Sequence, residues 1–94
     1  MDYRKKFLAE PGQRIKLHKI DPAYTAKHVS KKEAVPALEK YCRHLEKLQQ
    51  TLYAEKKRAL LVVVQALDAG GKDGTINHVM GVLNPQGARV VGFK

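Results

Sequence analysis

The sequence predicts an α/β fold, in which one long helix is followed by a right-handed βαβ unit with a parallel sheet. Three observations lead to this prediction. A helical period runs over residues 35–55, and a continuous apolar segment follows at 59–64. Six of the seven glycines lie between Gly70 and Gly92, where turn, helix and second strand would alternate.

Residues 1–34 show no sustained period and are expected to form an extended N-terminal segment. Pro11-Gly12 and Asp21-Pro22 indicate turns, and polar and apolar residues alternate between them over residues 14–20.

The predicted helix at 35–55 carries one apolar stripe, with charged residues on its other faces. Pro36 would suit its first turn, where a missing N–H has no intrahelical partner. The stripe lasts about two heptads, which favours packing on a sheet over a coiled coil. It consists of Leu38, Tyr41, Cys42, Leu45, Leu48 and Leu52.

Residues 59–64 (ALLVVV) predict a strand that is buried on both faces. A glycine-rich turn follows at 65–75, and apolar residues from Ile76 to Leu83 indicate a second helix. Residues 84–87 (NPQG) end that helix, and residues 88–93 resume an extended pattern. Together these segments predict the βαβ unit.

Composition places the chain among globular proteins, with 94 residues, 44% hydrophobic and 29% charged. The single cysteine, Cys42, excludes an intramolecular disulfide and a multi-cysteine zinc site, and the four histidines (18, 28, 44 and 78) lack ligand spacing. No apolar run is long enough to span a membrane, so a cytoplasmic protein without a membrane partner is expected.

The net charge of +9 is unevenly distributed, because fifteen of the eighteen Lys and Arg lie in residues 1–58. A basic surface of this kind attracts polyanions without identifying them. The candidates are nucleic acid, an acidic membrane, a phosphate polymer, or an acidic face of a larger protein.

The glycine-rich turn suits a phosphate cradle, because glycines let backbone N–H groups converge at a helix N-terminus. The Walker A pattern G-x-x-x-x-G-K-[ST] is met at Gly71 and Lys72, whereas Ala66 replaces the first glycine and Asp73 the hydroxyl residue. A purely structural tight turn is the alternative.

Two carboxylates, Asp68 and Asp73, flank this turn. They would repel phosphate unless a cation lies between them, so they point to Mg²⁺ or to a proton acceptor. The structural alternatives are a turn or N-cap role for Asp68 and a favourable interaction with the helix dipole for Asp73.

Residues 65–76 (QALDAGGKDGTI), followed by NPQG at 84–87, closely resemble the polyphosphate kinase 2 family. The resemblance implies the N-terminal part of a P-loop kinase-like three-layer fold. Residues 35–94 would be the N-terminal portion of a polyphosphate kinase 2-like P-loop phosphotransferase domain that is truncated at residue 94. The resemblance also implies phosphoryl transfer between inorganic polyphosphate and AMP or ADP with Mg²⁺. Within the family, Ala66 looks like a mark of the branch that phosphorylates nucleoside monophosphates. Many members carry arginine where this chain has Asn77.

The same resemblance assigns the site. Asp68 and Lys72 would be catalytic, and Asp68 would also lie at the metal. Since family members are considerably longer, the chain is expected to be an incomplete, inactive N-terminal fragment of a protein that is a homo-oligomer at full length. The residues expected to bind phosphate are Ala69, Gly70, Gly71, Lys72, Asp73, Gly74 and Thr75.

Two other functions are weighed against this one. The first is a small basic module that binds RNA or DNA and whose glycine turn is structural, although such a module has no need of Lys72 in this frame. The second is an ATP-dependent nucleoside monophosphate kinase. The sequence argues against it, because Asp73-Gly74 occupies the position where a Ser or Thr normally contacts Mg²⁺.

Overall fold

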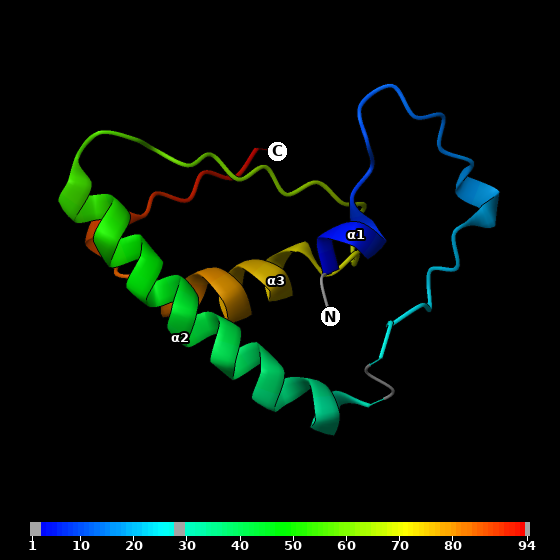
Figure 1. The fold of residues 1–94 in the computed structure, drawn as a ribbon, viewed down its shortest axis with the longest axis horizontal. Coiled ribbons are helices and arrows are strands. Elements are labelled where there is room, and N and C mark those ends of the chain that lie inside the picture. Colours follow the sequence, from blue (N-terminus) through cyan, green and yellow to red (C-terminus); the bar gives the residue numbers. More distant parts are fainter. Residues whose placement is uncertain (1–2, 28–29, 94) are drawn as a thin grey trace.

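The computed structural model describes residues 3–27 and 30–93 (Figure 1). In this part of the chain the regular structure is entirely helical. The α-helices are α1 (Tyr3–Phe7), α2 (Lys31–Glu55) and α3 (Lys72–Val79), and the 3₁₀ helices are η1 (Leu17–Lys19), η2 (Met80–Val82) and η3 (Pro85–Gly87).

The α/β prediction was therefore wrong: residues 3–27 and 30–93 contain no strand and no βαβ unit. Residues 59–67 and 88–93 run in the same direction across the top of Figure 1. No backbone hydrogen bond joins these two described segments. A strand exists only where its N–H and C=O groups pair with a neighbouring chain, so a β-branched sequence is not sufficient. The predicted burial is also absent, because Leu61 and Val63 are 86% and 78% exposed.

Helix α2 is confirmed, but it begins at Lys31 rather than at about residue 35. Its N-cap is Ser30, whose hydroxyl accepts a hydrogen bond from the Glu33 N–H at 3.3 Å. Pro36 therefore lies inside the helix and not in its first turn, at the cost of one helical hydrogen bond. The helix ends before Lys56, which adopts the left-handed conformation at φ 55°.

The most buried contact lies where α2 meets the end of α3. Cys42 and Gln49, two turns apart on α2, are the only buried residues in the described part of the chain. The Cys42 thiol donates to the His78 carbonyl at 3.7 Å, and Gln49 bonds to the backbone of Asn84. Cys42 thus has the core position that the sequence predicts.

The N-terminal segment packs on α2 through aromatic rings. The Tyr3 ring stacks on the Phe7 ring, and it contacts the ring of Tyr41 in α2 edge-on, with 6.3 Å between the ring centroids. The Phe7 ring also contacts the Tyr24 ring. Within the predicted extended piece at 14–20, η1 forms a single 3₁₀ turn instead. The predicted division into domains at 1–34 and 35–94 stays a prediction. Residues 1, 2, 28, 29 and 94 of these ranges lie outside the described residues.

Residues 3–27 and 30–93 include no helix that is both long and apolar enough to cross a membrane.

Candidate functional site

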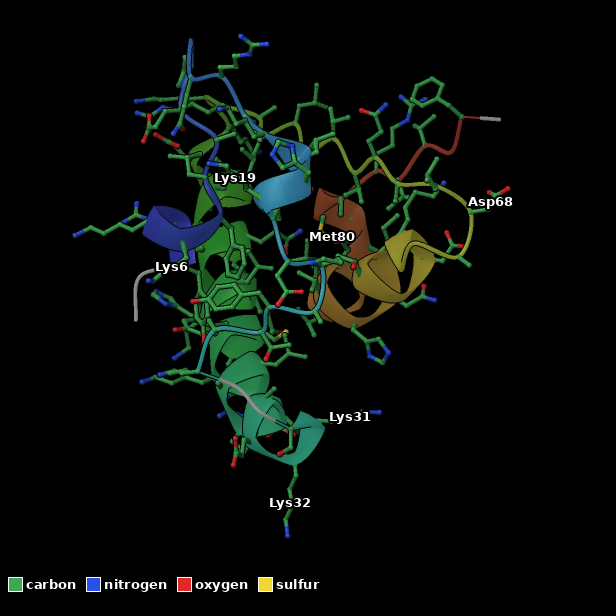
Figure 2. The ribbon with its side chains drawn as sticks, turned by 90° about the vertical axis from the view of Figure 1, so that its right-hand side faces the viewer. Lys6, Lys19, Lys31, Lys32, Asp68 and Met80 are labelled. Carbon is green, nitrogen blue, oxygen red and sulfur yellow. The ribbon has the colours of Figure 1, made fainter. Side chains whose placement is uncertain are left out.

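The glycine-rich turn lies between residues 59–67 and α3. Figure 2 shows its Asp68 at the outer edge of the molecule, on the side opposite Lys6. Its backbone folds back sharply, because the Gly70 N–H donates to the Leu67 carbonyl at 2.9 Å. Ala69 and Gly71 have positive φ angles of 60° and 87°. Gly71 is the N-cap of α3, so the helix begins at Lys72 immediately after the turn.

Two of the glycines are required for different reasons. A Cβ at Gly70 would lie 2.8 Å from the Leu67 carbonyl oxygen and 2.9 Å from the Ala66 Cβ, so no side chain fits there. At Gly71 there is open space, but the left-handed backbone disfavours any side chain. Gly74 has neither constraint.

The turn encloses a hollow of about 280 Å³. A second hollow of about 270 Å³ lies along α2 against Val79, and apart from Tyr41 and His44 its lining is apolar. Of these two hollows, the one at the turn is the candidate site, because it brings together a lysine, two carboxylates and a helix N-terminus. Its lining consists of Leu67, Asp68, Ala69, Gly70, Gly71, Lys72, Asp73 and Gly74.

The beginning of α3 contributes positive potential to one side of this hollow. The first backbone N–H groups of any α-helix lack an intrahelical acceptor, and no side chain caps them here. The helix dipole and the half-buried Lys72 add positive charge at the same end. An anion of the size of a phosphate group is the ligand that such a helix start favours.

Asp68 and Asp73 both line the hollow, and no ion pair joins either of them to Lys72 within the described residues. Two carboxylates with room for water and phosphate oxygens are the donor set that Mg²⁺ uses, since it keeps several waters and takes one or two protein carboxylates. The described residues contain no cluster of three or more His, Cys, Asp or Glu side chains that could hold a metal alone, and His28 lies outside them.

Thr75 is placed differently from the other predicted phosphate contacts. Its hydroxyl donates to the Gly71 carbonyl at 2.9 Å, and its N–H donates to the same oxygen. The side chain thus closes the first turn of α3, and Thr75 is not among the residues that line the hollow. Its contribution here is to fix the helix start.

The sequence analysis missed Gln49, which connects α2 to the segment after α3. The signal was present in the sequence, because Gln49 follows Cys42 by seven residues and interrupts the apolar stripe with a polar side chain. Such a residue is buried only if its amide finds partners.

Comparison with known proteins gives the family that this chain resembles. The profile of the polyphosphate kinase 2 family matches residues 28–94. An AMP/ADP-polyphosphate phosphotransferase of Meiothermus ruber is 49% identical over 90 residues, which cover 95% of this chain and 34% of the relative. An ADP-polyphosphate phosphotransferase of Rhodopseudomonas palustris is 40% identical over 94 residues, covering 96% and 31%. The chain thus spans about a third of the length of these relatives, and no solved structure matches it significantly.

Proposed function

The chain belongs to the polyphosphate kinase 2 family, and we propose that the whole protein transfers a phosphoryl group between inorganic polyphosphate and AMP or ADP. The names of the two relatives support these substrates. A homo-oligomeric state and a cytoplasmic location stay predictions.

The observation that carries the proposal is the position of Lys72 at the start of α3, directly after a turn whose backbone excludes side chains at residues 70 and 71. Phosphoryl transfer requires positioning and neutralisation of charge more than covalent chemistry. The N–H groups of the first turn of α3 would hold phosphate oxygens in the hollow. The Lys72 ammonium would neutralise charge on the group that moves.

We further propose Mg²⁺ as the cofactor, with Asp68 as its protein ligand and Asp73 beside it. The shared lining of one hollow by these carboxylates supports the assignment. When bound there, the ion would neutralise phosphate charge and orient the oxygens that it contacts. Asp68 would also orient the phosphate of the acceptor nucleotide, because it lines the same hollow as Lys72.

The first test is a calorimetric titration of the chain with tripolyphosphate. Lys72→Ala should weaken binding about tenfold or more, since a charged hydrogen bond contributes ~1.5–3 kcal/mol. Lys57→Ala is the matched control, because it removes the same charge from an exposed residue outside the turn. Equal affinity in the two variants would exclude Lys72 as a phosphate ligand.

The second test uses a protein of the relatives' full length that carries this sequence, supplied with polyphosphate, Mg²⁺ and AMP or ADP. It should form the next higher nucleotide, and Asp68→Asn should lower the rate about 10²-fold or more. A normal rate in that variant would contradict the role of Asp68. Activity with ATP as the sole donor would favour the monophosphate kinase alternative.

A further inference from the structure

Gln49 is the only buried polar residue in the described part of the chain, at 9% exposure. Its amide makes two hydrogen bonds to one residue: Nε2 donates to the Asn84 carbonyl at 3.0 Å, and Oε1 accepts from the Asn84 N–H at 3.1 Å. The Asn84 side chain in turn accepts from the Gln86 N–H. We refer to the pair of bonds between Gln49 and Asn84 as the amide clamp.

The clamp acts on a helix that is too short to be stable alone. Helix α3 has eight residues, one of which is Gly74, and isolated helices shorter than ~12–15 residues are marginal in water. The chain continues from α3 through η2 to Asn84, and Figure 2 shows Met80 of η2 beside α2. The two bonded attachments to α2, at His78 and Asn84, lie at or beyond the end of α3 that is farthest from the turn.

We propose that Gln49 is a positioning residue for phosphate binding: the amide clamp keeps the segment 72–84 folded, and so keeps the first N–H groups of α3 directed into the hollow. The inference rests on the proposed function, because it takes the turn to bind phosphate. If the clamp opens, the segment unfolds from Asn84 through η2 and α3 towards Lys72, and the N–H groups no longer converge.

Gly87 gives an independent way to open the clamp. A Cβ at residue 87 would collide with the Gln49 Nε2 and would lie 3.2 Å from the Tyr53 Cδ2. Gly87→Ala therefore displaces the Gln49 amide without changing residue 49 and without touching the turn.

Gln49→Glu allows the clamp to be opened by pH. A protonated carboxyl donates and accepts as the amide does, whereas a carboxylate faces the Asn84 carbonyl with no proton to give. Burial raises the pKa of such a carboxyl above that of an exposed glutamate, so acidic pH favours its protonated form and alkaline pH its ionised form. No residue of Met80–Gly87 is titratable, and the titratable residues of α2 nearest to Gln49 in the sequence are Glu46, Lys47 and Tyr53. His44 on α2 and His78 on α3 lie farther along the chain. All of these groups are present in wild type too, so the ratio of the variant to wild type isolates the introduced carboxyl.

The experiment measures tripolyphosphate affinity of each variant relative to wild type, at a temperature where all retain the wild-type circular dichroism spectrum. Gln49→Glu should match wild type at about pH 5 and bind about threefold to tenfold more weakly at about pH 8. Gly87→Ala should bind tripolyphosphate more weakly than wild type at both pH values. Gln50→Glu, which adds the same charge at an exposed neighbour, should give a ratio that does not change with pH.

A measurement without variants covers the case in which either substitution prevents folding. Coupling is reciprocal, so saturating tripolyphosphate should slow hydrogen exchange at the Asn84 N–H of the wild-type chain. A pH-independent ratio for Gln49→Glu, or an unchanged exchange rate at Asn84, would overturn the inference. Equal affinities of Lys72→Ala and wild type would instead overturn the proposed function itself, and the inference with it.

Discussion

Gly70→Ala tests whether the turn must keep its observed shape to bind phosphate. The added Cβ would lie 2.8 Å from the Leu67 carbonyl oxygen and 2.9 Å from the Ala66 Cβ, closer than real Cβ contacts come. The turn must then shift, and the Gly70 N–H bond to the Leu67 carbonyl must lengthen. Overpacking of this kind costs ~1–3 kcal/mol. If the added Cβ destabilises the conformation that binds phosphate by this amount, the affinity for tripolyphosphate falls about fivefold to a hundredfold.

Isothermal titration with tripolyphosphate measures this loss. Gly81→Ala is the control, because a Cβ at Gly81 meets nothing within 4 Å and its backbone has no positive φ. We expect Gly81→Ala to bind as wild type does. If Gly70→Ala bound equally well, the turn would tolerate a changed shape, and the argument from its geometry would fail.

Two other predictions concern the packing of the chain. Cys42 is 8% exposed, so its thiol should react with a soluble disulfide reagent far more slowly in the native chain than in denaturant; equal rates would contradict the α2–α3 contact. Leu61, Leu67 and Phe93 are 86%, 90% and 91% exposed, so the chain should bind a hydrophobic dye and sediment faster as its concentration rises. A monomer at all concentrations that binds no dye would contradict this exposure.

The sequence predicted the helices better than their boundaries. The apolar stripe identifies α2 correctly, but the prediction that Pro36 lies in its first turn was wrong. Ser30 and Glu33 have the spacing of a capping box and indicated the earlier start, which the structure shows through the Ser30 cap. Similarly, the period from Ile76 indicated α3, whose first turn begins four residues earlier at Lys72.

The predicted sheet failed for a physical reason. Residues 59–64 have the composition of a buried strand, but strand formation depends on partners that composition does not reveal. The candidate site depended less on such partners, because its turn is local: Gly70 and Gly71 owe their roles to their own backbone and to Leu67. The sequence pattern marks Gln49 as an interruption of the apolar stripe, but it could not identify the partner of Gln49, because Asn84 lies 35 positions away.

The most direct test of the account is a titration of the isotopically labelled chain with tripolyphosphate, followed residue by residue through its backbone amide resonances. We expect the largest shifts on the turn and the first turn of α3, from Ala69 to Gly74, and we expect Lys72→Ala to reduce them. Shifts spread over the basic residues of 3–27 and α2, with the turn unaffected, would contradict this expectation and would favour a basic surface that binds polyanions without a site.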